Sequence, residues 1–174
     1  MVKNHPKKII AVSGIVFGHV PLSVVAIIFL PAPSAESIPY IIGSAFIHQG
    51  YQWYLLSAYQ LGDLTKVYPI ARGFGPIVAT TVSIIFLGLV IKDLAILSIF
   101  LISLGIMSVG VFDHRNFKNT KILKYSLLTG FFIGLYSLVD GYGARVSLSA
   151  ITYMSWSFLI GALMFSVLLK IKKY

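Results

Sequence analysis

Long apolar segments dominate this chain and constrain its fold more than any other feature. Six of them lie near residues 9–30, 38–60, 69–89, 93–112, 122–144 and 149–170. Each is close to the ~20 residues that a helix needs to cross a bilayer. Hydrophobic residues make up 57% of the sequence and charged residues 11%, which is more apolar surface than a soluble domain of this length needs. We therefore predict an all-α protein, a polytopic bundle of about six transmembrane helices with short connections.

The net charge of +9 is unevenly distributed over this predicted topology. If the six segments alternate in direction, one side of the membrane receives twelve basic residues and the other only Lys92 and Arg145. The twelve are Lys3, Lys7, Lys8, Lys66, Arg72, Arg115, Lys118, Lys121, Lys124, Lys170, Lys172 and Lys173. Cytoplasmic loops of membrane proteins carry such an excess of Lys and Arg. We expect an integral protein of a bacterial inner (cytoplasmic) membrane, with both ends of this chain in the cytoplasm. Its partner is then the lipid bilayer and not a nucleic acid.

Signatures of enzymes are missing from the sequence. It has no cysteine, which excludes disulfides, thiolate metal sites and cysteine nucleophiles. It also has no phosphate-binding P-loop, no nucleophile elbow and no HExxH zinc motif. We expect no catalytic residues, no cofactor and no metal ion, and we expect that the protein is not an enzyme.

A polar stripe follows the second apolar segment. His48, Gln52, Tyr59 and Asp63 are spaced so that a regular helix would place them within an arc of about 60°. Polar groups inside a bilayer normally face a cavity or another helix. The stripe therefore predicts either the wall of a polar pathway or a seam of interhelical hydrogen bonds without a ligand. That helix has no second histidine or carboxylate at ligand spacing, so we do not expect a metal site there.

The run from Tyr68 to Pro76 places an arginine among helix-bending residues. A helix that begins at Pro69 would hold Arg72 in its first turn, where unpaired N–H groups already repel a cation. We expect Arg72 to contact either an anionic substrate or a lipid phosphate. Pro76 has no N–H, so the Arg72 carbonyl loses its helical partner. The hinge candidates are Pro69, Gly73, Gly75 and Pro76.

Asp140 lies within a predicted span, whereas the other carboxylates lie at the edges of spans or outside them. A buried carboxylate needs a partner or a proton, and a proton-coupled carrier uses that property. Arg145 is the expected partner. Five residues of regular helix point the two side chains apart, so their pairing requires Gly141 and Gly143 to bend the segment. Three roles stay open for Asp140: a structural ion pair, coupling to a proton or substrate, or an interfacial position without function.

Glycines spaced by four residues occur as the pairs Gly14 and Gly18, and Gly130 and Gly134. Such spacing lets two helix backbones approach closely in a membrane. We favour packing within one chain over a dedicated dimer motif, and we leave homodimer formation open.

Two segments resemble a known family. The segment from Ala58 to Gly73 reads AYQLGDLTKVYPIARG and is followed by Pro76 and an apolar run to Gly88. It resembles the core signature of the EamA-type transporters in the drug/metabolite transporter superfamily. The segment from Leu138 to Arg145 is similar to the start of the second repeat in a subset of these proteins. The resemblance implies about ten helices in two inverted repeats around a central cavity, and transport of small metabolites or drugs.

The same resemblance implies a domain organisation. Residues 1–112 would hold helices two to five of the first repeat, 113–122 a basic cytoplasmic loop, and 123–174 the first two helices of an incomplete second repeat. The chain would then be a fragment without the first helix and the last few helices. Arg72 and Asp140 match motif positions. Family members commonly carry a glutamate where this chain has Leu89, so the role of that glutamate is not carried over.

These observations favour a transporter that works by alternating access on a small-molecule substrate, with proton-coupled export as an open alternative. The candidate cavity residues are Arg72, Asp140, His48, Gln52, Tyr59, Tyr68 and Arg145. Two other classes stay open. One is a membrane-embedded enzyme acting on lipid or isoprenoid substrates, for which an apposed pair such as Asp140 with His48 is the most this chain could assemble. The other is a noncatalytic membrane scaffold, which a dry polar seam would favour.

Overall fold

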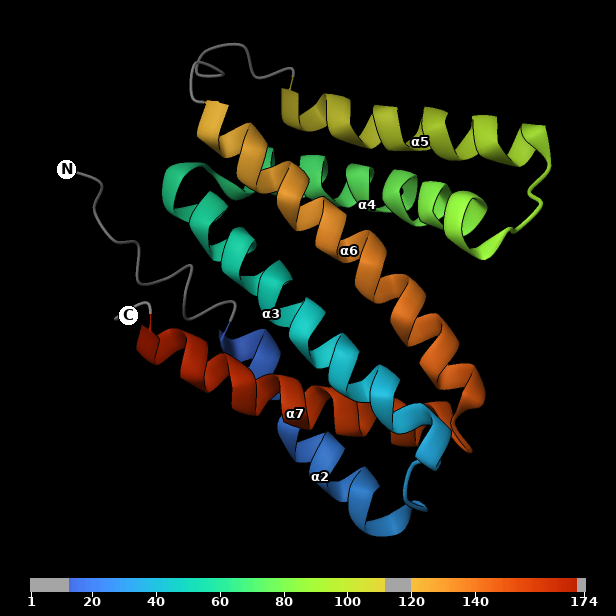
Figure 1. Ribbon diagram of the computed structural model, residues 1–174. Coiled ribbons are helices and arrows are strands. Elements are labelled where there is room, and N and C mark those ends of the chain that lie inside the picture. Colours follow the sequence, from blue (N-terminus) through green and yellow to red (C-terminus); the bar gives the residue numbers. More distant parts are fainter. Residues whose placement is uncertain (1–12, 112–119, 172–174) are drawn as a thin grey trace. The chain divides into compact units, whose positions relative to one another are not determined.

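The computed structural model describes residues 13–111 and 120–171, and the regular structure in these ranges is entirely helical (Figure 1). The elements are α2 (Val20–Phe29), the short 3-10 helix η1 (Ala35–Ser37), α3 (Ile38–Leu61), α4 (Leu64–Leu87), α5 (Asp93–Val111), α6 (Thr120–Val146) and α7 (Ala150–Ile171). The predicted all-α class is therefore confirmed. Most of the predicted basic loop at 113–122 lies outside the described residues.

Four helices, α4 to α7, are long and apolar enough to cross a membrane, so the chain is an integral membrane protein. The helix α3 has the length of a span, with 24 residues, but polar side chains such as His48, Gln49 and Gln52 interrupt its apolar surface. The helix α2 belongs to a shorter apolar helical stretch, Ser13–Phe29. Polar residues in a span need a protein environment, and α3 is therefore the helix on which a buried site is to be sought.

The chain forms two compact units. Within the described residues, the first unit consists of residues 53–111 and 120–138, and the second of residues 13–52 and 139–171. The helices α4 and α5 belong to the first unit, α2 and α7 to the second, and α3 and α6 contribute to both. This grouping by contact is a different kind of division from the repeats expected at 1–112 and 123–174, which stay a prediction.

Glycines bring α4 close to α5 in the first unit, where the two helices lie side by side (Figure 1). A Cβ atom added to Gly73 would lie 2.6 Å from the Ser103 carbonyl oxygen of α5. One added to Gly110 would lie 2.7 Å from the Lys66 carbonyl oxygen of α4. Such close approach of two backbones is the usual basis of helix association in membranes.

The contact of α4 with α6 uses glycines of both helices. A Cβ atom at Gly130 would lie 2.7 Å from the Ala71 carbonyl oxygen, and one at Gly134 would lie 2.7 Å from Val78. The prediction that Gly130 and Gly134 support close helix packing is therefore confirmed. Gly14 and Gly18 have no atom within 4 Å of an added Cβ, so they make no such contact in the described residues.

The start of α4 differs from the prediction. The helix begins at Leu64, and Pro69 and Pro76 both lie inside it. Arg72 is therefore an interior residue of the helix, and its expected place in a first turn is wrong. The amides of Lys66 and Val67 already donate to the Asp63 carbonyl oxygen, at 3.1 and 3.0 Å. Because a bilayer offers no water to unpaired backbone groups, a helix persists through prolines that would end it in a soluble protein.

The end of α4 depends on a glycine conformation. Gly88 follows the helix in the left-handed region, with φ at 62°. This conformation lets the Leu89 amide donate to the Ser83 carbonyl oxygen at 3.1 Å. Glycine adopts such a φ without the steric cost that a Cβ atom would bring, and the helix stops here for that reason.

The second unit is held by ring contacts and by a hydroxyl group at its turn. The rings of Phe17 and Phe165 lie 6.0 Å apart, and α2 lies beside α7 (Figure 1). The Ser34 hydroxyl donates to the Val146 carbonyl oxygen at 2.8 Å and so ties the turn before η1 to the end of α6. The first part of α3, the last part of α6 and α7 belong to this same unit.

Candidate functional site

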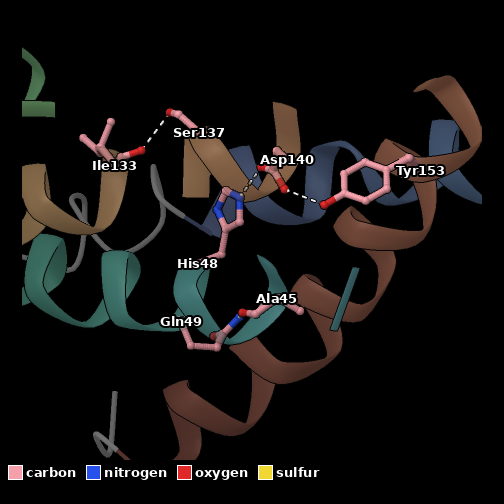
Figure 2. A network of polar contacts seen from close by, with 7 residues as sticks. All are labelled: Ala45, His48, Gln49, Ile133, Ser137, Asp140 and Tyr153. Carbon is pink, nitrogen blue, oxygen red and sulfur yellow. Dashed lines mark hydrogen bonds and ion pairs between the residues drawn. The ribbon is translucent and has the colours of Figure 1, made fainter. Parts of the chain in front are cut away.

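Asp140 of α6 is buried, with 8% of its surface exposed, and bonds side chains from two other helices. His48 Nε2 of α3 lies 3.2 Å from Asp140 Oδ2. The Tyr153 hydroxyl of α7 donates to Asp140 Oδ1 at 3.0 Å. Figure 2 shows the imidazole and the phenol approaching the carboxylate from different helices. We call Asp140, His48 and Tyr153 the Asp140 network.

The α3 side of the site follows from a spacing of four residues. Ser44, His48 and Gln52 recur at that spacing and so lie on one face of the helix. Ser44 is completely buried, and Gln52 is 6% exposed. The Ser44 side chain lies against the Asp140 carboxylate and the Tyr153 hydroxyl and interacts with both. Ser44 and His48 of this face therefore both contact the network.

The α7 side repeats the spacing with Tyr153, Ser157 and Gly161. The Gln49 side-chain amide of α3 donates to the Gly161 carbonyl oxygen at 3.0 Å. Since Ser44 lies near Tyr153 and Gln49 bonds Gly161, α3 and α7 run in the same direction along this contact. Two polar helix faces thus meet around the carboxylate from α6.

A glycine creates the place for the Tyr153 ring. A Cβ atom added to Gly143 would lie 2.7 Å from the Tyr153 hydroxyl oxygen and closer still to its ring carbons. Gly143 follows Asp140 by three residues on the same helix, so the ring packs on the α6 backbone beside the carboxylate. Tyr153 is fully buried as a result. Gly143 therefore positions the phenol for its hydrogen bond.

Buried polar atoms without a protein partner gather in the second unit. Among the described residues, six buried side-chain polar atoms make no hydrogen bond, and five belong to this unit. The five are Ser44 Oγ, Gln49 Oε1, Gln52 Oε1, Thr152 Oγ1 and Ser157 Oγ. Each lies within one helical turn of His48 or Tyr153 in the sequence. The hydroxyls of Ser44 and Ser157 still interact with Asp140 or Tyr153, which leaves Gln49 Oε1, Gln52 Oε1 and Thr152 Oγ1 without a partner. Because an unsatisfied buried polar group costs about 1–3 kcal/mol, each of these three atoms is a candidate for a hydrogen bond to water or a ligand.

The structure brings together some predicted site residues and separates others. Asp140 and His48 are in contact, and Gln52 is buried one turn beyond His48. Tyr59 is buried as well, but it belongs to the first unit. Asp63 lies beyond the end of α3 as the residue that precedes α4, and it is exposed. The predicted stripe is therefore a polar face only over part of its length.

The prediction that Arg145 pairs with Asp140 is wrong. The helix α6 stays regular through Gly141 and Gly143 to Val146, so Asp140 and Arg145 point in different directions. Arg145 is exposed in the last turn of α6. The carboxylate bonds His48 and Tyr153 instead.

Arg72 and Tyr68 belong to the first unit and not to the Asp140 network. Both side chains are exposed on α4, and the Arg72 guanidinium lies 5.3 Å from the centre of the Tyr68 ring. This distance is typical of a cation–π contact. The two predicted groups of site residues therefore lie in separate units.

Sequence reasoning missed Tyr153, Ser44 and the role of Gly143. The spacing of Ser44 from His48 was a signal for Ser44, because it continues the polar face by one turn. Nothing local singles out Tyr153 among the ten tyrosines of the chain. Within the described ranges, no group of three or more His, Cys, Asp or Glu side chains lies close enough to hold a metal ion.

Fold and site together define a polytopic helical membrane protein with a buried carboxylate network inside one of its units. Comparison with protein-family models, curated proteins and solved structures found no match to this chain. The resemblance to EamA-type transporters therefore rests on the two sequence segments alone.

Proposed function

We propose that the protein is a membrane carrier of small molecules related to the EamA-type transporters, and that the Asp140 network contacts the substrate. The observation that carries this proposal is the buried Asp140 carboxylate, in a unit that also holds buried polar atoms of Gln49, Gln52 and Thr152 without a partner. Ionisable residues inside a membrane-spanning helix normally face a partner, a water-filled path or a substrate. The network supplies partners for the carboxylate, whereas Gln49 Oε1, Gln52 Oε1 and Thr152 Oγ1 are available to a ligand or to water.

The alternatives explain these atoms less well. A scaffold would be stabilised by a seam in which every polar group is paired, because a partly satisfied network is worse than an apolar contact. An enzyme could use His48 and Asp140 as an acid–base pair. It would also need a nucleophile or metal beside that pair. Among the described side chains, the third member is the Tyr153 phenol, which already donates to the carboxylate.

Each group has a distinct task in the proposed carrier. Asp140 would hold a proton or a positively charged group of the substrate, and His48 and Tyr153 would orient the carboxylate through one oxygen each. The hinge would be the α4 segment from Pro69 to Pro76, where two prolines remove helical hydrogen bonds. Alternating access, with proton-coupled export as one mode, would expose the network first to one side of the membrane and then to the other.

Transport by the reconstituted chain tests this proposal. The protein at its full natural length would be inserted into liposomes loaded with labelled amino acids, amines, sugars and nucleosides, and efflux would be followed over time. We expect efflux of at least one class above empty liposomes, and at least a tenfold loss for Asp140→Asn. Gly141→Ala is the matched control, since an added Cβ there contacts nothing within 4 Å. Absence of flux for every class, or equal flux in Asp140→Asn, would refute the carrier.

A further inference from the structure

We propose that the Asp140 network is a proton-binding site in which His48 takes up the proton and Asp140 fixes the tautomer of its imidazole. Proton uptake itself does not depend on the proposed carrier function, whereas the role of the proton as a coupling ion rests on that function. Three properties of the site carry this assignment: the partners of the carboxylate, the acceptor character of its oxygens and the exposure of the side chains.

Both oxygens of the Asp140 carboxylate already have side-chain partners (Figure 2). Oδ1 accepts the hydrogen bond of the Tyr153 hydroxyl at 3.0 Å, and Oδ2 lies 3.2 Å from His48 Nε2. The Ser44 side chain interacts with the carboxylate as well. A molecule that coordinates the carboxylate would have to displace one of these groups, whereas a proton needs only one lone pair on a side chain. The proton is therefore the ligand that this site binds without rearrangement.

The contact of His48 with Asp140 determines which atom takes up the proton. The Tyr153 hydroxyl donates to Oδ1, so the carboxyl group acts as an acceptor, as an ionised carboxylate does through both oxygens. Two acceptors do not hydrogen-bond each other, and His48 Nε2 therefore carries hydrogen in its contact with Oδ2. In a neutral imidazole with hydrogen on Nε2, the lone pair lies on Nδ1. Uptake of a proton from water forms one N–H bond at Nδ1 and converts the ring into an imidazolium cation.

Exposure distinguishes His48 from its two partners. The side chain of His48 is 23% exposed and that of Asp140 is 11% exposed, whereas Tyr153 is fully buried. A proton that arrives from water thus reaches the imidazole before it reaches the carboxylate. Histidine is also the side chain whose charge ordinarily changes between about pH 5 and 8.

The other titratable groups that face His48 come from three helices. The Tyr51 ring of α3 lies 6.2 Å from the imidazole, Asp140 faces it from α6, and Tyr153 approaches the same carboxylate from α7. Phenols ordinarily ionise only near about pH 10, so the two tyrosines stay neutral where an imidazole titrates. The cationic side chains of the described second unit are exposed near helix ends, and they are Arg145 and Lys170.

Protonation changes the contact of α3 with α6. A neutral imidazole donates an ordinary hydrogen bond to the carboxylate, whereas an imidazolium forms a charge-assisted ion pair, which is stronger in surroundings of low dielectric. His48 belongs to α3 and Asp140 to α6, so proton binding tightens the contact of these two helices within the second unit. In a carrier, this difference would let the proton favour one of two helix arrangements.

Nitrogen NMR of the histidine rings tests the assignment. The protein at its full natural length would be labelled with 15N-histidine and recorded in lipid nanodiscs from pH 8 to pH 5, with the His48 signals identified by their loss in His48→Gln. We expect hydrogen on Nε2 at the basic end and an imidazolium at the acidic end. At pH 6, Asp140→Asn should lower the share of imidazolium by about threefold or more, because the cation loses its counterion.

The matched control is His19→Gln. His19 is exposed, and its Nδ1 lies 2.6 Å from the Ile15 carbonyl oxygen, so its titration reports on a histidine beside a neutral backbone group. This variant should leave the His48 signals unchanged, and their change to the same extent as in Asp140→Asn would overturn the assignment.

The spectra of the wild type keep the proposal falsifiable if Asp140→Asn does not fold. A His48 ring that stays neutral down to pH 5, or that carries hydrogen on Nδ1 alone at pH 8, would overturn it. An equal share of imidazolium in the wild type and in Asp140→Asn would overturn it as well.

The liposome assay separates the proton site from the carrier. Protonation of His48 with the expected effect of Asp140→Asn, but without flux of any solute, would refute the carrier and support the proton site. Flux that persists while His48 stays neutral would support the carrier and refute the proton site. We expect flux to change about threefold or more when nigericin collapses a pH gradient across the liposomes, as a coupling ion requires. Flux that ignores the gradient would refute the coupling role.

Discussion

At the scale of single residues, each oxygen of the Asp140 carboxylate contacts a side chain from another helix: Oδ2 contacts His48, and Oδ1 accepts a hydrogen bond from Tyr153. Hydrogen bonds to charged groups contribute more than neutral ones, because the low dielectric of the interior strengthens them. The two partners come from α3 and α7, so the carboxylate also joins these helices to α6. Losing one partner therefore affects both the geometry of the site and the stability of the second unit.

Replacement of Tyr153 by Phe measures the contribution of its hydroxyl. The ring keeps its place beside Gly143, but Asp140 Oδ1 loses its donor. We expect a loss of about 1.5–3 kcal/mol in the free energy of unfolding, which is the range for hydrogen bonds to charged groups. Thermal unfolding in detergent, followed by circular dichroism, gives the measurement. Tyr142→Phe is the control, since Tyr142 is 53% exposed, and an equal effect of the two variants would contradict the role of Tyr153.

Replacement of Gly143 by Ala tests the packing of the Tyr153 ring against the backbone of α6 at Gly143. The new methyl group would overlap the ring, so the phenol must move away from Asp140. We expect a destabilisation of about 1–3 kcal/mol, as for other overpacked cores. Chemical unfolding in mixed micelles measures it, with Gly141→Ala on the same helix as the control. If the two alanines behave alike, Gly143 does not position the ring.

At the scale of helices, glycines set the distance of α4 from its neighbours, and side-chain volume is therefore tightly limited there. The sequence indicated Gly130 and Gly134 through their spacing, because this pattern recurs wherever membrane helices meet. Gly73, Gly75 and Gly110 make equally close contacts without such a spacing. Their role depends on which helix lies opposite, and a local pattern carries no information about that.

Replacement of Gly130 by Ala tests the contact of α4 with α6. The added Cβ would lie 2.7 Å from the Ala71 carbonyl oxygen, which belongs to helix backbone and cannot yield without moving α4. We expect a loss of about 1–3 kcal/mol in stability, seen as a lower midpoint of thermal unfolding. Gly105→Ala on α5 is the control, because nothing lies within 4 Å of its added Cβ. An unchanged midpoint for Gly130→Ala would contradict the packing.

At the scale of the whole molecule, the excess of basic residues on one side predicts the orientation in the membrane. The cysteine-free chain allows a direct test with single cysteines and a membrane-impermeant thiol reagent. We expect Glu36→Cys and Lys92→Cys to react from outside intact cells, and Lys121→Cys and Lys170→Cys to react only after permeabilisation. All four residues are exposed, so accessibility reports the side of the membrane. The reverse labelling pattern would show that the chain has the opposite orientation in the membrane.

Prediction from sequence succeeded for features that depend on local composition. Long apolar segments specify membrane helices because a bilayer leaves the backbone no alternative that satisfies its hydrogen bonds. It failed at Pro69, where a rule drawn from soluble helices placed the helix start five residues late. The structure also separates the ionisable groups by burial: Arg72 and Arg145 are exposed, whereas Asp140 is buried. Exposure depends on the neighbours of a helix, and those are not encoded within the helix itself.

The sequence by itself predicted the all-helical class and six apolar segments, of which four form helices able to span a membrane, and it singled out Asp140 and His48 as polar groups within apolar segments. Only the tertiary structure decided that these two residues are partners, that Tyr153 completes the network and that Arg145 does not belong to it. The physical reason is that hydropathy is a property of each segment and is therefore readable along the chain. Pairing across 92 residues depends instead on which helix faces meet, and small glycine contacts such as that of Gly143 determine the meeting.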